Sequence, residues 1–145
     1  MTSKIVVGLD GSQSGERALT YAQGLAQRLE SCEIIVAFII EWSPYTFQTA
    51  EENAQRHKRR EEEISTARAR VVDPAVKALS AAGFAATGVV RHGDVADLLD
   101  KIAKKDGAEQ IVVARSSEGG FVNRVFGTST VNLVLHASVP VTVVP

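Results

Sequence analysis

The chain has 145 residues, of which 45% are hydrophobic and 23% are charged, and its formal net charge is -1. This length suits one domain with its own core, and a charge near zero argues against nucleic acid or an anionic membrane as a partner. The single cysteine, Cys32, cannot form an internal disulfide, which is typical of a reducing compartment. The sequence shows no apolar run of membrane-span length and no signal peptide, so we expect a cytoplasmic protein.

The first half of the chain alternates short apolar runs with helical periods. Residues 4–9 (KIVVGL) and 33–40 (EIIVAFII) are continuous apolar runs, as expected of strands buried on both faces. Between them, small and apolar residues recur at helical spacing. A longer helix is expected from near Glu51 to about Ala82, and Pro74 predicts a kink or a restart within it because proline removes a helical hydrogen bond.

The second half continues the same alternation. Gly83 is expected to end the long helix, and Asp94 is expected to cap the next one after a strand at about 85–91. The remaining expected elements are a helix that ends at Gly107, a strand over 110–114, a helix from near Gly127 to about Ala137, and a strand over 139–144.

Five strands that alternate with helices predict parallel pairing and right-handed crossovers. The expected fold class is therefore α/β, with a doubly wound, five-stranded parallel sheet. No internal repeat, linker or low-complexity tract divides the chain, so we expect one domain over residues 1–145.

Two loops of this sheet carry suitable chemistry for a ligand. In open parallel sheets, ligands bind beyond the carboxyl ends of the strands, where the strand order reverses. The loop at 8–12 (GLDGS) follows the first strand, and the loop at 114–130 follows the fourth. If these strands are neighbours, the two loops face each other across a crevice.

The second loop ends at the expected start of a helix, at Gly127-Thr128-Ser129-Thr130. A helix N-terminus offers unpaired N–H groups and a partial positive charge, so it can bind a phosphate. The alternative is that Thr128 only caps its helix. Asp10 has a similar pair of readings: it either caps the first helix as a turn residue or meets a ribose or a phosphate-bound cation.

The chain resembles the universal stress protein family over nearly its whole length. The resemblance rests on the opening residues 5–12 (IVVGLDGS), on the turn at 91–94 (RHGD), and most strongly on residues 111–145, which include Phe126-Gly127-Thr128 and the closing VPVTVV. The resemblance implies a Rossmann-like sheet of strand order 3-2-1-4-5, which places the reversal between the first and fourth strands.

Nucleotide-binding members of that family carry the pattern G-x2-G-x9-G-[ST] after the fourth strand. With Gly127-Thr128 on its last two positions, this chain reads A-x2-S-x9-G-T, because Ala114 and Ser117 stand where the first two glycines would be. A methyl group at 114 would narrow the approach of a nucleotide, and serine at 117 lacks the backbone freedom of glycine. Restoring both glycines should tighten binding.

The resemblance also implies a set of nucleotide-binding residues. Asp10 matches the acidic residue near ribose and phosphates, and Phe38 lies near the position whose backbone meets adenine. Ala114 and Ser117 stand at the positions of two family glycines but do not have the same residue type. The full implied set is Asp10, Phe38, Val113, Ala114, Ser117, Gly127, Thr128, Ser129 and Thr130. The implied ligand is ATP or AMP, with Mg²⁺ as an optional companion of the phosphates.

Catalytic and metal-binding patterns are missing from the sequence. It contains no G-x-S-x-G nucleophile motif and no P-loop lysine, and His92 and His136 are far apart and have no nearby Cys or Asp at metal-ligand spacing. We therefore expect no metal site and no efficient enzyme, although slow ATP hydrolysis that depends on Asp10 stays an alternative.

The apolar run Val139–Val144 would lie at a sheet edge, where it invites pairing with a second copy of the chain. Family members commonly dimerise through this strand, so the resemblance implies a homodimer. Two functions follow from the sequence: a stress-response regulatory protein with an adenine-nucleotide crevice, or a dimeric interaction module that has lost nucleotide binding.

Overall fold

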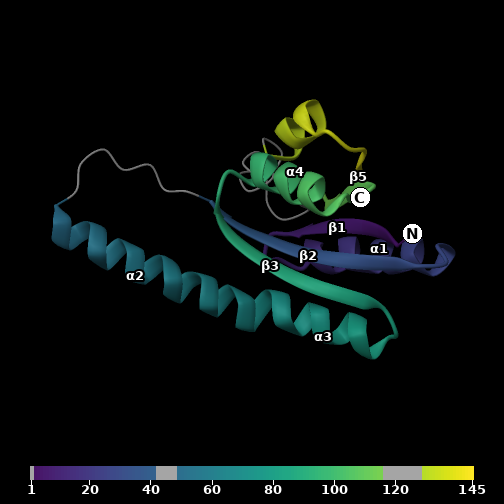
Figure 1. Cartoon of the computed structure of the whole chain (residues 1–145), viewed down its shortest axis with the longest axis horizontal. Coiled ribbons are helices and arrows are strands. Elements are labelled where there is room, and N and C mark those ends of the chain that lie inside the picture. Colours follow the sequence, from purple (N-terminus) through teal and green to yellow (C-terminus); the bar gives the residue numbers. More distant parts are fainter. Residues whose placement is uncertain (1, 42–48, 116–128) are drawn as a thin grey trace.

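The computed structural model describes residues 2–41, 49–115 and 129–145. Its centre is a parallel sheet of five strands in the order β3-β2-β1-β4-β5, seen in Figure 1. The strands are β1 (Ser3–Leu9), β2 (Cys32–Glu41), β3 (Ala85–Gly93), β4 (Gln110–Ala114) and β5 (Val141–Val144). The predicted fold class, strand count and strand order are confirmed.

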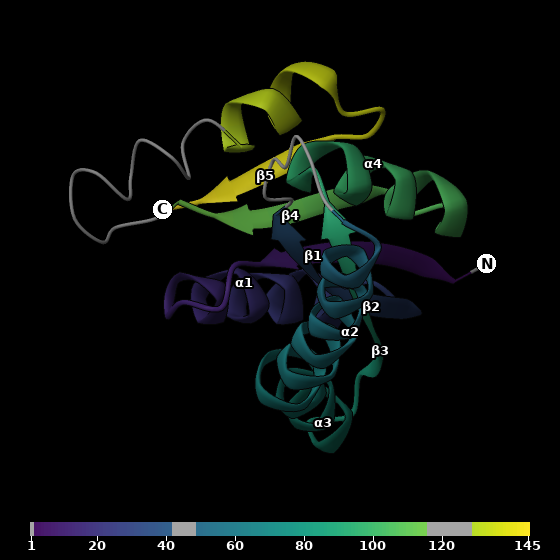
Figure 2. The same cartoon turned by 90° about the vertical axis from the view of Figure 1, so that its left-hand side faces the viewer.

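Helices cover both faces of this sheet, as Figure 2 shows. The helices are α1 (Ser14–Arg28), α2 (Ala50–Ala67), the π-helical turn η1 (Arg68–Val72), α3 (Asp73–Ala81), α4 (Val95–Asp106) and the last helix (129–136). We call the side covered by α1, η1 and α3 the α1–α3 face, and the side covered by α4 and the last helix the α4 face.

The α1–α3 face is packed by small side chains and by one glycine. Ala18, Ala22 and Ala26 of α1 are buried against the sheet, so the helix lies close to the strands. On β3, a Cβ atom at Gly88 would overlap Cγ1 of Val72. The close approach of η1 to β3 therefore requires a residue without a side chain.

The α4 face has a separate core. Val6, Ile35, Ile111 and Val113 of the sheet pack with Leu99 of α4. As predicted, Asp94 caps this helix: its Oδ2 accepts a hydrogen bond from the Asp97 N–H at 2.9 Å. Gly107, with φ of 67°, ends it in the left-handed conformation that glycine adopts without steric strain.

The long helical segment is interrupted at the proline, as expected. The N–H of Asp73 donates to the carbonyl of Arg68, five residues back, so one π turn precedes Pro74 and α3 restarts there. Helix α2 begins one residue before the expected Glu51, because Thr49 and Glu52 form a capping box that the sequence analysis missed.

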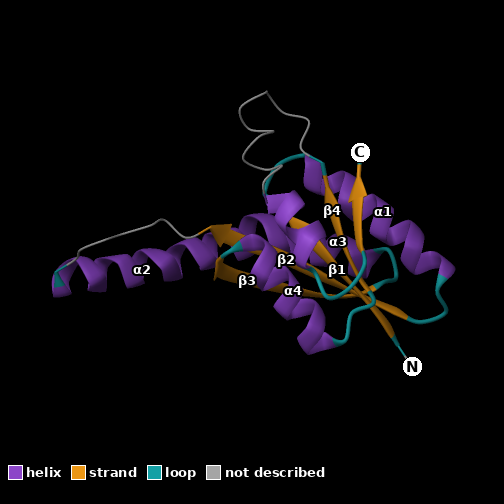
Figure 3. Cartoon of the chain, turned by 90° about the horizontal axis from the view of Figure 1, so that it is seen from above, coloured by secondary structure: helices purple, strands orange, loops and turns teal. Residues whose placement is uncertain are grey.

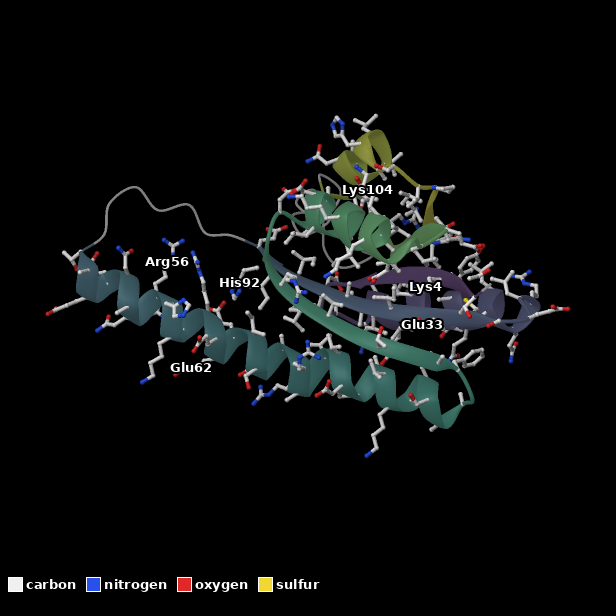
Figure 4. All side chains as sticks on the ribbon, in the orientation of Figure 1. Lys4, Glu33, Arg56, Glu62, His92 and Lys104 are labelled. Carbon is white, nitrogen blue, oxygen red and sulfur yellow. The ribbon has the colours of Figure 1, made fainter. Side chains whose placement is uncertain are left out.

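Helix α2 extends away from the sheet, as Figure 3 shows, and Ala67 is its one buried residue. Figure 4 shows its charged side chains and His92, which points from β3 towards the helix. There His92 Nε2 lies 2.9 Å from Oε2 of Glu63. Among residues 2–41, 49–115 and 129–145, no helix is both long and apolar enough to cross a bilayer.

Two local predictions were wrong. The fifth strand begins at Val141 rather than at Val139, because Pro140 has no N–H to donate to β4; its carbonyl still accepts from the Ile111 N–H at 3.0 Å. Asp10 does not cap α1. That helix begins at Ser14 without a side-chain cap, and the Asp10 carboxylate instead closes a turn with Ser12.

Candidate functional site

The reversal of strand order lies between β1 and β4, which are paired in parallel with Val7 opposite Val112. On its other side, β1 pairs with β2, with Leu9 opposite Phe38. The carboxyl ends of three neighbouring strands therefore meet at one edge of the sheet. This is the place where open α/β sheets bind their ligands.

A crevice of about 270 Å³ opens at this edge. Its walls come from β1, β2 and β4, from the start of α4 and from the last helix. Its described lining consists of Gly8, Leu9, Asp10, Phe38, Ile39, Ile40, Glu41, Val95, Leu99, Val113, Ser129, Thr130 and Leu133. Most of these side chains are apolar, and the polar ones are a few carboxylates and hydroxyls, as is usual for small-molecule pockets.

Five of the residues expected to bind a nucleotide line this one crevice. Asp10 follows β1, Phe38 lies on β2, Val113 lies on β4, and Ser129 and Thr130 begin the described part of the last helix. The first loop and the described end of the second, Ser129 and Thr130, thus lie at the same crevice.

Ala114 occupies a different position from the one that the motif suggested. It is 2% exposed and belongs to the core of the α1–α3 face, whereas its neighbour Val113 lines the crevice on the α4 face. Because side chains alternate along a strand, the Ala114 methyl group points away from the crevice. Ser117, Gly127 and Thr128 lie outside the described residues.

The turn after β1 is held by the Asp10 side chain. Its Oδ1 accepts hydrogen bonds from the Ser12 N–H at 2.9 Å and from the Ser12 hydroxyl at 2.6 Å. The Ser12 Oγ in turn accepts from the Ser14 N–H at 3.2 Å, at the first residue of α1. The Asp10 carboxylate therefore has a fixed place at the mouth of the crevice.

A second carboxylate stands opposite the last helix. The Ser129 hydroxyl donates to Oε1 of Glu41, at the end of β2, across a distance of 3.3 Å. This contact links β2 to the last helix over the crevice. The sequence analysis missed Glu41, because the apolar run that predicted this strand ends at Ile40, whereas β2 continues to Glu41.

The floor of the crevice is tightly packed. A Cβ atom at Gly8 would lie 3.0 Å from Cδ1 of Leu99 and 3.1 Å from Cγ1 of Val113. Glycine at this position therefore keeps the strand, α4 and the crevice in close contact. The sequence analysis included Gly8 in its first candidate loop. It did not identify Leu99 and Leu133, which line the crevice from helices and belong to no recognised motif.

No group of three or more His, Cys, Asp or Glu side chains that could hold a metal ion occurs in the part of the chain that the structure describes. Asp10 and Glu41 alone bring carboxylates to the crevice among its described lining. A divalent cation would thus need the phosphates of a ligand to complete its oxygen ligands.

Among the residues that the structure describes, the group with a displaced pKa is the Cys32 thiol, at the opposite end of the sheet. Burial, followed by the negative charges of Glu109 and Glu33, raises the pKa of the Cys32 thiol. The thiolate is the reactive form, so this environment disfavours redox chemistry at Cys32.

A second hollow of about 460 Å³ lies on the α1–α3 face, between α1 and the η1–α3 segment. Glu16 and Gln23 of α1 and Arg70 of η1 are among the residues that line it. It lies between helices, and its lining shares Leu9 with the crevice but none of the predicted nucleotide-binding residues.

Comparisons with known proteins agree with this architecture. The universal stress protein family matches residues 1–145. A solved structure of a universal stress protein family member from Burkholderia pseudomallei is 26% identical, with a TM-score of 0.69 and coverage of 99% of this chain and 96% of that one. None of the curated proteins matches the chain.

Two further structures were solved with adenine nucleotides. A universal stress protein in complex with cAMP is 22% identical, with a TM-score of 0.65 and coverage of 99% of this chain and 96% of that one. A universal stress protein family member from Arabidopsis thaliana with AMP bound is 16% identical, with a TM-score of 0.66 and coverage of 98% and 90%. At these identities the two structures share the fold with this chain. The match over residues 1–145 decides the assignment: the chain belongs to the universal stress protein family.

Proposed function

We propose that this protein binds an adenine nucleotide in the crevice at the ends of β1, β2 and β4, and acts as a non-enzymatic regulatory module of the stress response. The observation that supports it best is the convergence of Asp10, Phe38, Val113, Ser129 and Thr130 on one crevice of about 270 Å³. The structures with cAMP and AMP show that other proteins of this fold bind such ligands.

The parts of the crevice suit the parts of a nucleotide. The apolar side chains of Ile39, Val95 and Val113 on the α4 face offer a surface for a purine ring, which is flat and largely apolar on its faces. The carboxylate of Asp10 can accept hydrogen bonds from ribose hydroxyls. The hydroxyls of Ser129 and Thr130 can donate to a phosphate oxygen.

Isothermal titration calorimetry with AMP, ADP and ATP, with and without Mg²⁺, tests the proposal. The Thr130→Val variant removes a crevice hydroxyl while it keeps the shape of the side chain, and we expect it to weaken binding about fivefold. Thr87→Val makes the same change on an exposed residue of β3 and should leave affinity unchanged. Absence of binding heat with every nucleotide would refute the proposal.

We also propose a homodimer through the edge of β5. This strand pairs with β4 and stands at the end of the sheet order, and its Val143 is 37% exposed. On the neighbouring last helix, Val131, Val134 and Leu135 are exposed as well. An apolar edge of this kind favours symmetric pairing with a second copy. Retention of the dimer without nucleotide binding would identify the protein as a ligand-free interaction module.

Sedimentation at micromolar concentration tests the dimer. Val143→Lys places a charge on the edge strand and should yield monomers. Tyr21→Lys changes an exposed aromatic residue of α1, which is 40% exposed, and should leave the dimer intact. A monomeric wild-type protein would contradict this second proposal. The cytoplasmic location expected from the sequence stays a prediction.

A further inference from the structure

The charge of the crevice bears on which adenine nucleotide it accepts. Its described lining contains two carboxylates, Asp10 and Glu41, and no lysine, arginine or histidine. Phosphate sites in proteins normally offer positive charge or several N–H donors. Among the described walls, Glu41 adds a negative charge beside the hydroxyls of Ser129 and Thr130, where we expect the phosphate.

Glu41 stands closest to the part of the crevice where a phosphate would bind. Its Oε1 accepts the hydrogen bond of the Ser129 hydroxyl at 3.3 Å. That hydroxyl is one of the donors expected to hold a phosphate. In the free protein, however, it already donates its hydrogen bond to the Glu41 carboxylate. A phosphate must displace Glu41 or bind beside it, and both alternatives become less favourable as the phosphate carries more charge.

The size of the crevice points the same way. Its volume of about 270 Å³ lies at or just below the lower end of the range of roughly 300–1,000 Å³ for pockets that hold drug-sized ligands. Its apolar walls suit a nucleoside.

We infer that Glu41 determines the nucleotide specificity of this crevice by disfavouring phosphate charge, so that affinity falls from cAMP to AMP to ATP. This inference rests on the proposed nucleotide-binding function. The carboxylate of Glu41 belongs to an exposed residue, so its repulsion acts through solvent and is weakened by salt. The differences between ligands should therefore be largest at low ionic strength.

Calorimetric titration of cAMP, AMP and ATP without Mg²⁺, at low and high salt, tests this inference. Glu41→Gln removes the charge, and its amide oxygen can still accept the Ser129 hydrogen bond. We expect the variant to bind ATP about tenfold more tightly than the wild type, cAMP only about twofold more tightly, and AMP to an intermediate degree. The gain for ATP should shrink at high salt.

Glu109→Gln is the matched control. It changes the net charge by the same amount on an exposed residue that precedes β4, at the other end of the sheet, and should alter none of the three affinities. If Glu41→Gln changes the affinities for cAMP, AMP and ATP by the same factor, or not at all, while the nucleotides still bind, this inference is overturned and the proposed function stands. If neither protein binds any of the three, both are overturned.

Discussion

The two faces of the sheet are packed in different ways. On the α1–α3 face, alanines of α1 and Gly88 of β3 let helices lie directly on the strands, and the hollow on that side, about 460 Å³, lies between α1 and α3. On the α4 face, larger side chains such as Leu99 and Leu133 hold the helices, and the crevice of about 270 Å³ opens at the strand ends.

This difference separates structural from functional roles. The closely packed face leaves little room at the strands, so its residues act mainly on stability. The α4 face meets the reversal of strand order, so the same residues support the core and line the crevice. Substitutions on the first face at residues that do not line the crevice should change folding alone, and substitutions of crevice residues on the second face should change folding and binding together.

The largest effect is expected at Gly88, on the α1–α3 face. A methyl group at this position would overlap Cγ1 of Val72 and lie 3.3 Å from Cγ2 of Val76. Valine is stiff at χ1, so the helix itself must move, and Gly88→Ala should lower the free energy of unfolding by about 3 kcal/mol. Urea denaturation measures this loss.

Gly24→Ala is the control for that experiment. A Cβ atom at Gly24, in the interior of α1, would meet no atom within 4 Å, so alanine there should raise stability by roughly 0.5–1 kcal/mol. If Gly88→Ala and Gly24→Ala lower the free energy of unfolding equally, close packing against Val72 is not the reason for glycine at position 88.

A smaller effect is expected at Gly8, on the α4 face. Its methyl group would press on the ends of Leu99 and Val113, and because those atoms can give way we expect Gly8→Ala to lower the free energy of unfolding by about 1.5 kcal/mol. Unlike Gly88→Ala, it should also weaken AMP binding in calorimetry. Ala78→Leu, in the hollow on the α1–α3 face, should leave AMP affinity unchanged. If Gly8→Ala leaves AMP affinity unchanged, or if Ala78→Leu lowers it, the two faces do not differ in function as proposed.

The next effect concerns the first residues of the helices. Helix α4 is capped by the Asp94 side chain, whereas Gln13, the N-cap residue of α1, makes no capping hydrogen bond with its side chain. In urea denaturation, Asp94→Ala should therefore lower the free energy of unfolding by about 1 kcal/mol, and Gln13→Ala should lower it by less than about 0.5 kcal/mol. Asp94→Asn keeps an acceptor oxygen and should retain most of the stability. If it lowers the free energy of unfolding as much as Asp94→Ala does, the side chain does not act as a cap.

The smallest effect is kinetic and concerns Cys32, at the start of β2. Because burial and the charges of Glu109 and Glu33 raise the pKa of its thiol, the thiolate fraction at pH 8 is below that of an ordinary cysteine. Iodoacetamide should react more slowly with the folded protein than with the urea-unfolded chain, and the rate should keep rising above pH about 8.5. A rate that levels off below that pH would contradict the raised pKa.

The fold class could be predicted from the sequence because β1, β2 and β4 are largely buried on both faces, whereas the strand order came from the family resemblance. Runs such as KIVVGL and QIVVA stand out against helical periods, and β4 was predicted to the residue. The error at β5 arose because Val139-Pro140 has the composition of a strand, although Pro140 cannot donate a hydrogen bond to β4.

The candidate site was harder to predict. Residues that follow strands, such as Asp10 and Ser129, could be placed at the crevice from topology. The direction of Ala114 could have been found from strand alternation, since Val113 and Ala114 must face opposite sides. Glu41 could not, because its role depends on a hydrogen bond to Ser129, which follows it by 88 residues and which no local pattern records.

The strand order also has a consequence for synthesis of the chain on the ribosome. The central strand β1 is made first; β2 can pair with one side of it soon afterwards, and β3 then pairs with β2. Its other side has no partner until β4 emerges, when Val6 finally meets Ile111. A nascent chain that ends before Gln110 would therefore expose an apolar strand edge, which favours aggregation, so the cell needs rapid completion or a chaperone during this interval.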